Sequence, residues 1–356
     1  MLEAPRRLVT RSLAQPTIRD DDALLRVEAC GLCGTDHEQY SGMLFGGFAF
    51  VPGHETVGVI EELGGAAAQR WGVSVGDRVA VEVFQSCRTC APCRAGEYRR
   101  CERHGLRDMY GFVPVDRPPA LWGGYAQVQY LAPDTMLVPV PDGIDPVLAT
   151  LFNPVGAGIR WGVTLPGTRA GDVVAVLGPG IRGLATVAAV REAGAGFVMV
   201  TGAGERDSCR LDAARSFGAD LVVDVDSGEP VAALREATGG LADVVVDVTA
   251  NAPRALAQGI ALARPGGTVV VAGMRGDGPL PGFRADDVVL KELRVLGALG
   301  VDVAAYSAAL ELVASGRYPF ADVGRRVVGL DDVGGLLAAM AGERDEAPPI
   351  HGVVQP

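Results

Sequence analysis

The chain has 356 residues. Chains of this length usually form more than one hydrophobic core, so we expect two domains. Hydrophobic residues make up 48% and charged residues 21%, an ordinary globular composition, and the scattered glycines and prolines exclude a collagen-like or low-complexity chain. The net charge is -11 without a long basic run, so neither nucleic acid nor an anionic membrane surface is expected as a partner.

The N-terminal stretch "MLEAPRRLVTRSLAQP" lacks the apolar core of a signal peptide, and no run of 18 apolar residues occurs anywhere. We therefore expect a soluble, cytoplasmic protein. In that reducing compartment the seven cysteines indicate metal binding or catalysis rather than disulfides.

Up to about residue 150 the chain consists of short β-rich runs separated by Gly, Pro and Asp. These runs are "ALLRVEACGLC", "ETVGVIEELG", "GDRVAVEV", "YAQVQYL" and "TMLVPVP". Short strands broken by turn residues are typical of an all-β unit with many loops.

From about Gly171 the pattern changes to apolar strands that alternate with helices. "GDVVAVLG", "FVMVTG", "DLVVDV", "ADVVVDVTA" and "TVVVAGM" are rich in Val and lack polar alternation, which is typical of parallel strands covered on both faces. Repeated βα units predict a doubly wound α/β sheet.

The chain after about Leu299 is expected to hold two helices and a closing strand. The helices are predicted in "VDVAAYSAALELVASGRYPF" and "DDVGGLLAAMAGERDE", and the strand "IHGVVQP" is expected to rejoin the first unit. We therefore assign residues 1–154 and 299–356 to one domain and residues 155–298 to the other.

Four of the cysteines lie within "CRTCAPCRAGEYRRC", at spacings C-x2-C-x2-C-x7-C. Four thiolates that turn toward one point form a closed tetrahedral zinc site, which stabilises a loop and leaves no position for a substrate. Disulfides or a redox C-x-x-C pair fit less well, since no signal peptide and no thioredoxin-like strand precede them. The segment therefore predicts a structural zinc site at Cys87, Cys90, Cys93 and Cys101.

Two further segments carry residues suited to an open metal site. "CGLCGTDHEQY" contains Cys33, and "PGHETVG" contains His54 and Glu55. A thiolate, an imidazole and a carboxylate can hold zinc and leave a position for an alcohol oxygen. Taken alone, a single Cys is more often a core residue and a single His more often structural.

In combination these features resemble the zinc-dependent medium-chain alcohol dehydrogenases, of the bacterial branch that includes polyol, threonine and glucose dehydrogenases. The resemblance covers nearly the whole chain: "CGxCGTD", "GHExxGVI", "GDRVAV", the four-cysteine segment, "GGYAQ", a glycine-rich turn and the closing "GVVQP". It implies an N-terminal chaperonin-10-like β domain followed by a Rossmann domain, with zinc and a nicotinamide cofactor in the cleft between them.

The resemblance also implies roles for individual residues. Cys33 and His54 would be catalytic zinc ligands, with Glu55 as an adjacent carboxylate that can join or leave the ion. Asp36 would orient the ligating imidazole, and Thr35 would bond the substrate hydroxyl and begin a proton relay. Relatives form homodimers or homotetramers, which here would pair through the strand near residues 293–300.

Two positions depart from the family pattern. A further ligand, usually Cys, Glu or Asp, is expected just before the Rossmann domain, and counting back from the glycine turn places Asn153 there. A neutral amide is a poor zinc ligand, so the metal is expected to rest on Cys33, His54, Glu55 and water, or to be held weakly. Where many relatives have a relay histidine this chain has Glu38, and His37 comes one position early.

The segment "VVAVLGPGIRG" places Gly178, Gly180 and Gly183 between a strand and a helix. With Ile181 and Arg182 between them, these glycines form a G-x-G-x-x-G turn, which allows close approach to a pyrophosphate at the helix N-terminus. The next strand should end in Asp or Glu for NAD, but its end falls at Thr201 and Gly202.

No carboxylate is expected at that strand end to repel a 2′-phosphate, and Arg206 and Arg210 follow. The arginines could equally lie in solvent at the start of a helix. We therefore expect a slight preference for NADP, with use of both cofactors left open.

Three functions remain open at this stage. The first is a zinc-dependent alcohol dehydrogenase that transfers a hydride between a secondary alcohol, polyol or sugar and NAD(P). The others are a zinc-poor reductase of an activated double bond and a non-catalytic nucleotide-binding relative. The substrate itself is not readable: Phe45, Phe48 or Phe50 could lie at the mouth of the cleft or in the core.

Overall fold

The computed structural model describes residues 1–44 and 46–356, so the prediction for Phe45 lies outside the described residues. The chain divides into two compact units. The first unit comprises Met1–Asn153, Leu310–Ala314 and Ala321–Pro356, and the second comprises Pro154–Ala309 and Ser315–Phe320.

The first unit is built on a mainly antiparallel sheet. Its strands follow the order β14 (Arg325–Val328), β15 (His351–Val354), β3 (Ala23–Leu32), β4 (Glu55–Leu63), β5 (Arg78–Val81) and β7 (Leu137–Pro139), and β6 (Val128–Leu131) pairs with β3. The last strand, β15, is antiparallel to β3, so the predicted return of the C-terminus to this unit is confirmed. A hairpin of β1 (Leu2–Ala4) and β2 (Arg7–Leu8) opens the chain.

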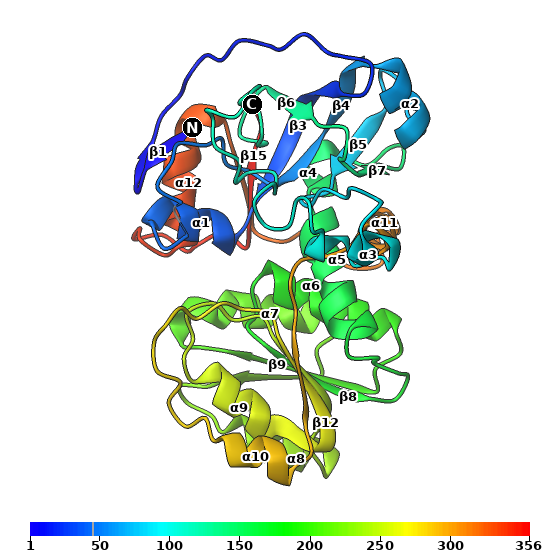
Figure 1. Ribbon diagram of the computed structural model, residues 1–356. Coiled ribbons are helices and arrows are strands. Elements are labelled where there is room, and N and C mark those ends of the chain that lie inside the picture. Colours follow the sequence, from blue (N-terminus) through cyan, green and yellow to red (C-terminus); the bar gives the residue numbers. More distant parts are fainter. Residues whose placement is uncertain (45) are drawn as a thin grey trace. The chain divides into compact units, whose positions relative to one another are not determined.

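The prediction that the first 150 residues are all-β is wrong, because several short helices join the sheet. They are α1 (Gly34–Ser41), α2 (Gly65–Trp71), α3 (Ala91–Arg94) and α4 (Pro146–Ala149), and α12 (Val333–Met340) packs against α1 (Figure 1). The helices α1 and α2 end at Gly42 (φ 97°) and Gly72 (φ 66°), whose left-handed backbone terminates a helix. With only two turns each, they carry too little apolar periodicity to be recognised from the sequence.

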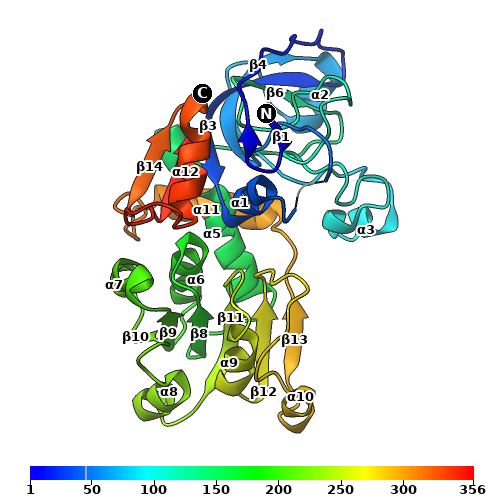
Figure 2. The same cartoon turned by 90° about the vertical axis from the view of Figure 1, so that its left-hand side faces the viewer.

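The second unit is a parallel sheet in the order β10 (Leu221–Asp224), β9 (Phe197–Gly202), β8 (Val173–Leu177), β11 (Ala242–Asp247), β12 (Ala263–Val271) and β13 (Arg294–Gly297). Figure 2 shows the strands in this sequence. In chain order this is 3-2-1-4-5-6, the Rossmann arrangement, so the predicted doubly wound fold is confirmed.

Helices cover both faces of this sheet. In Figure 1, α6 (Ile181–Glu192) and α7 (Ser208–Ser216) lie on one side, and α8 (Pro230–Thr238), α9 (Ala255–Leu262) and α10 (Ala285–Leu290) lie on the other. The remaining helices are α5 (Phe152–Ile159), which continues into a π-helical turn at Arg160–Thr164, and α11 (Val303–Ala314). Valines of β8, β9, β11 and β12 are buried in the core, which accounts for their continuous apolar runs.

The order of the strands also locates a crevice. β8 and β11 are neighbours, but the chain leaves them toward opposite faces of the sheet, and ligands of such sheets bind at the carboxyl ends of these two strands.

Within the described residues, no helix combines the length and the apolar character that crossing a membrane requires.

Candidate functional site

The pairing of β3 with β4 brings together the two candidate metal-binding segments. Gly31 lies opposite Glu55 in the register, so the residues just beyond, Cys33 and His54, become neighbours. Cys33 Sγ is 3.2 Å from His54 Nε2, and the ligand atoms of Cys33, His54 and Glu55 all lie within 4.8 Å of one another. All three side chains are buried. A Cβ on Gly31 would come 2.4 Å from Glu55 Oε2, so a larger residue at this position would displace the carboxylate from its present place.

Asp36 connects the cysteine to the histidine. It lies in the first turn of α1, where its Oδ2 accepts a hydrogen bond from the Cys33 backbone N–H at 2.9 Å. Its Oδ1 faces His54 Nδ1 at 3.5 Å. With Nδ1 directed at a carboxylate, His54 presents Nε2 to the cysteine sulfur, which is the orientation that a ligating imidazole needs.

These donors fit a zinc ion. With bonds of about 2.3 Å to sulfur and about 2.0 Å to nitrogen, tetrahedral zinc holds the two donors about 3.5 Å apart. The 3.2 Å between Cys33 Sγ and His54 Nε2 is close to that value. Asn153 is buried at the start of α5, and Thr35 is half-buried in α1 beside Asp36.

His37 and Glu38, the residues at and beside the expected relay position, have different surroundings. His37 Nε2 lies 3.1 Å from Glu343 Oε1, in an exposed cluster. Arg6, which donates to both oxygens of Glu343, together with His37, lowers the pKa of that carboxyl to about 2. Glu38 is buried. The structure therefore places His37 in an ion pair with Glu343.

The four-cysteine segment also fits zinc. Cys87 Sγ and Cys93 Sγ are 3.8 Å apart, and Cys90 Sγ and Cys101 Sγ are 4.0 Å apart. Tetrahedral zinc with bonds of about 2.3 Å separates its sulfurs by about 3.8 Å, whereas a disulfide requires about 2.05 Å. The Thr89 hydroxyl and the Cys90 backbone N–H donate to the Cys87 sulfur and lower the pKa of Cys87 to about 5, which favours the thiolate that zinc binds.

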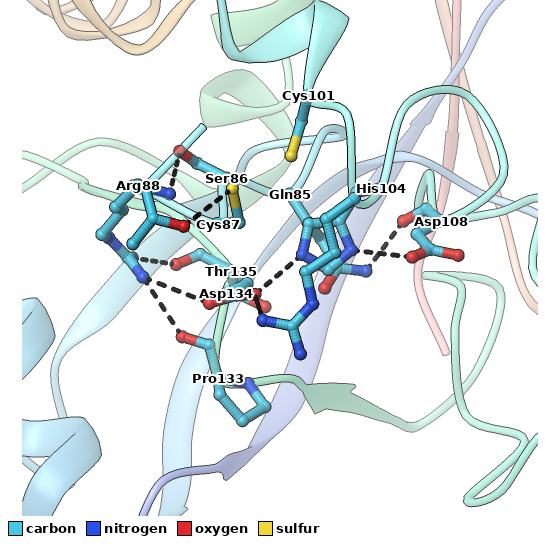
Figure 3. A network of polar contacts seen from close by, with 12 residues as sticks. Gln85, Ser86, Cys87, Arg88, Cys101, His104, Asp108, Pro133, Asp134 and Thr135 are labelled. Atoms are coloured by element: carbon cyan, nitrogen blue, oxygen red, sulfur yellow. Dashed lines mark hydrogen bonds and ion pairs between the residues drawn. The ribbon is translucent and has the colours of Figure 1, made fainter. Parts of the chain in front are cut away.

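A histidine that the sequence did not single out anchors this segment. His104 Nδ1 lies 2.7 Å from Asp108 Oδ2, and His104 Nε2 lies 2.8 Å from Asp134 Oδ2 (Figure 3). Arg88 donates to the Thr135 carbonyl at 3.0 Å. The two aspartates are 26 positions apart in the chain, so no local motif reveals the contact.

The second unit holds a cavity of about 610 Å³ at the carboxyl ends of β8, β9 and β11. Gly178 adopts a φ of 102°, and a Cβ on Gly183 would lie 1.9 Å from the Gly178 carbonyl oxygen, so both positions require glycine. Gly180 is the N-cap of α6 and Ile181 its first residue. The lining also contains Arg182 of this turn and four predicted residues from beyond it: Thr201, Gly202, Arg206 and Arg210.

The structure adds a carboxylate near the end of β9 that the sequence reading missed. Asp207 lines the cavity, its Oδ2 accepts a hydrogen bond from the Ala203 N–H at 3.0 Å, and its Oδ1 accepts one from Arg210 Nη1 at 3.2 Å. This carboxylate therefore comes from the turn before α7 and not from the end of β9. One of the two candidate arginines is already paired with it.

A buried ion pair lies next to residues that line this cavity. Asp247, at the end of β11, accepts hydrogen bonds from the Thr249 N–H (3.1 Å) and hydroxyl (2.6 Å) and forms an ion pair with Arg275. Arg275 also donates to the carbonyls of Ala252 and Gly273. Burial raises the pKa of Asp247, while Thr249 and Arg275 stabilise its charged form. The loops after β11 and β12 are thereby joined beside the cavity.

Comparisons with known proteins agree with this geometry. Residues 19–142 match the alcohol dehydrogenase GroES-like domain family, and residues 183–315 match the zinc-binding dehydrogenase family. A probable alcohol dehydrogenase of Mycobacterium tuberculosis (strain ATCC 25618 / H37Rv) is 71% identical over 357 residues, which cover 100% of this chain and 97% of that protein.

More distant relatives belong to the same group. An erythritol/L-threitol dehydrogenase of Mycolicibacterium smegmatis is 31% identical over 87% of this chain and 85% of its own. The crystal structure of a zinc-binding dehydrogenase from Sinorhizobium meliloti 1021 bound to NADP has a TM-score of 0.84 and 29% identity, covering 99% of this chain and 97% of that one.

The chain belongs to the zinc-dependent medium-chain alcohol dehydrogenase family. Within that family it is an alcohol dehydrogenase, an oxidoreductase that transfers a hydride between an alcohol and a nicotinamide cofactor. The family resemblance and the activity predicted from the sequence are thus confirmed.

Proposed function

We propose that Cys33, His54 and Glu55 hold a catalytic zinc ion, and that Cys87, Cys90, Cys93 and Cys101 hold a structural one. The observation that supports the catalytic site is the convergence of a thiol, an imidazole and a carboxylate within 4.8 Å. When bound there, zinc supplies a Lewis acid that polarises an alcohol oxygen. The remaining chemistry depends on the residues around it.

Asp36 accepts the hydrogen bond that fixes the Cys33 backbone and faces the distal nitrogen of His54, so it holds both ligands in position. Thr35, one residue before it, accepts the proton of the substrate hydroxyl and passes it toward solvent. Asn153 contributes a neutral amide in place of a charged ligand, which leaves the site with less negative charge than in relatives with an acid or thiolate there.

The proposed cofactor is NADP in preference to NAD, with the nicotinamide supplying the hydride acceptor. The cavity in the second unit is lined by Arg182, Arg206, Arg210 and Arg254 against the single carboxylate of Asp207, a balance that favours an additional phosphate. Arg206 and Arg210, which follow the end of β9 and line this cavity, are the proposed ligands of the 2′-phosphate. The Sinorhizobium meliloti relative binds NADP, which supports this preference.

We further propose a homo-oligomer in the cytoplasm. Among the described residues none of the seven cysteines forms a disulfide, as expected in a reducing compartment.

Metal analysis of three proteins tests the two-zinc proposal. The unmodified chain should contain two zinc ions, and Cys33→Ser and Cys90→Ser should each contain one. Cys33→Ser should abolish alcohol-dependent cofactor reduction with little loss of stability. Cys90→Ser should lower the stability, because zinc binding and folding of the four-cysteine segment are coupled. One zinc ion in the unmodified protein, or full activity in Cys33→Ser, would refute the assignment.

A further inference from the structure

The two loops that follow β11 and β12 are joined by the side chain of Arg275. Its Nε donates to the Ala252 carbonyl at 3.2 Å, and its Nη1 donates to the Gly273 carbonyl at 2.8 Å. Its Nη2 donates to Thr249 Oγ1, at 3.1 Å, and to the carboxylate of Asp247. One guanidinium thus contacts the end of β11 and both loops, and its planar set of donors fixes these groups relative to one another.

This contact is buried. The side chain of Asp247 is 0% exposed and that of Arg275 is 8% exposed. Hydrogen bonds in such surroundings are stronger than in water, and a buried charge that loses its partner is strongly unfavourable. The arrangement of the two loops is therefore specified by this ion pair and its hydrogen bonds.

The loop after β11 has a backbone conformation that few residues adopt. Asn251 has a φ of 55°, in the left-handed region that Asn tolerates better than most side chains. Its N–H donates to the Met274 carbonyl at 3.0 Å, and a Cβ on Gly273 would collide with the Thr249 carbonyl oxygen. The backbones of the two loops are therefore in direct contact, and the bonds of Arg275 hold them together.

The same loop forms one side of the cavity in the second unit. Thr249, Asn251 and Ala252 line this cavity. A Cβ on Gly178 would lie 3.0 Å from Thr249 Cγ2, so the threonine methyl group lies against the glycine turn. Because β8 lies between β11 and β9 in the sheet, this side of the cavity is distinct from the side formed by the residues that follow β9 (Figure 2).

We propose that Arg275 is a positioning residue for the nicotinamide cofactor, because it holds residues 248–252 in the conformation that completes the cofactor cavity. A dinucleotide that enters a preformed cavity does not have to order this loop, and its affinity is higher for that reason. The 2′-phosphate is proposed to bind on the side of β9, so Arg275 supports NAD and NADP equally. The inference rests on the proposed function, because it takes this cavity as the cofactor site.

The test measures the dissociation constants of NADH and NADPH for the zinc-loaded full chain, from the fluorescence of the nicotinamide, with and without Arg275→Lys. Lysine keeps the positive charge beside Asp247, but it cannot present a planar set of donors to both loops. If the loop then adopts the binding conformation about a tenth of the time, both dissociation constants rise about tenfold. The kcat at saturating cofactor should stay close to that of the unmodified enzyme, since a loss of uniform binding raises KM alone.

Arg264 provides a matched control. It joins the opposite ends of the same two strands, where its Nε donates to Asp243 Oδ1 at 2.6 Å. Its side chain is 48% exposed, and it is not among the described residues that line the cavity. Arg264→Ala should therefore leave both dissociation constants unchanged.

A double variant, Asp247→Asn with Arg275→Met, removes the contact between the loops without leaving a buried charge unpaired. Its circular dichroism spectrum should match that of the unmodified protein, and it should bind both cofactors at least as weakly as Arg275→Lys does. Unchanged dissociation constants in both variants, or a loss of affinity confined to NADPH, would overturn the proposal.

Gly183→Ala separates this inference from the proposed function. The new Cβ would collide with the Gly178 carbonyl oxygen, so this variant disturbs the glycine turn directly. If Gly183→Ala leaves the binding of both cofactors unchanged, the cavity is not the cofactor site, and the proposed function of this cavity is wrong. If Gly183→Ala weakens both cofactors and Arg275→Lys weakens neither, only the role of Arg275 is wrong.

Discussion

Asp36 shows how one side chain organises the candidate zinc site. It is buried, caps the first turn of α1 through the Cys33 N–H, and directs its other oxygen at His54 Nδ1. Among the described residues that oxygen and His54 Nδ1 have no hydrogen-bond partner. The carboxylate is therefore available to stabilise the imidazole once zinc increases the acidity of its N–H.

Asp36→Asn should weaken zinc binding at this site by about tenfold to a hundredfold, the usual effect of losing a group that orients a metal ligand. Zinc release to a competing chelator measures this directly, and the release from the four cysteines within the same protein is the internal control. Unchanged release of the more labile zinc would contradict the role of Asp36.

Arg206 and Arg210 are the two arginines that follow the end of β9 and line the cavity. Loss of a charge-assisted contact of about 1.5–3 kcal/mol corresponds to about tenfold to a hundredfold in affinity. Arg206→Ala and Arg210→Ala should each raise KM for NADP by up to that factor with little effect on NAD, because both arginines line the cavity. Values of kcat/KM for the two cofactors measure this preference. A tenfold preference of the unmodified enzyme for NAD would contradict the predicted preference for NADP.

Gly202 is not a suitable position for a substitution that shifts the cofactor preference from NADP to NAD. A Cβ there would lie 3.0 Å from Pro179 Cγ and 3.1 Å from both Asp207 Cβ and Leu211 Cδ2. An acid at the exposed neighbour Ala203 avoids these contacts, so Ala203→Asp is the change expected to favour NAD.

At the scale of elements, a buried chain of hydrogen bonds links β14, β15 and the end of α4. Arg325 Nε donates to His351 Nδ1 at 3.0 Å, so the imidazole is neutral and carries its proton on Nε2. That nitrogen lies 3.4 Å from Thr150 Oγ1, which in turn donates to the Val147 carbonyl at 2.7 Å. Burial and, secondarily, the charge of Arg325 lower the pKa of His351 to about 3.

The neutral His351 predicts a loss of stability in acid. An unfolded histidine has a pKa of about 6.5, so between pH values of about 6.5 and 3 the unfolded chain binds one more proton and the free energy of unfolding falls as pH falls. Between pH 7 and pH 5 the expected contribution is about 2 kcal/mol.

Urea unfolding of the zinc-loaded protein at both pH values measures this contribution. Because acid also promotes zinc release, the informative quantity is the difference between the unmodified protein and His351→Gln at each pH. That difference should shrink from pH 7 to pH 5. A difference independent of pH would count against a buried neutral imidazole.

At the scale of the whole molecule, the second unit has an incomplete sheet edge. β13 pairs with β12 and, among the described strands, with no other. Exposed apolar side chains surround this edge: Val289 (73% exposed), Leu290 (77%), Val295 (43%) and Leu299 (51%). An uncovered edge with apolar neighbours is suited to pairing with a second copy across a two-fold axis, which extends the sheet.

Sedimentation velocity at micromolar concentration should therefore show a dimer or tetramer. Val295→Asp should shift the population toward monomer, because the new carboxylates would meet across the axis. Val75→Asp places the same charge on an exposed site of the first unit and should leave the assembly intact. A monomeric unmodified protein would refute the proposed interface.

Local patterns were sufficient for much of the architecture. The Val-rich runs predicted the parallel strands, and the Gly178–Gly183 turn placed the nucleotide crevice, because both depend on residues close together in the chain. The spacing of the four cysteines likewise predicted a common point for their sulfurs. The helices α1 and α2 were missed because each is too short to show a period.

The sequence by itself therefore determined the fold class, the glycine turn and the four-cysteine segment. Tertiary structure alone decided other contacts: the return of Asp207 to the end of β9 and the pairing of His37 with Glu343. The meeting of Cys33 and His54, which the β3–β4 register produces, was implied by the family resemblance and not by the spacing of the residues. These contacts depend on how strands pair and turns fold back, which spacing along the chain does not specify.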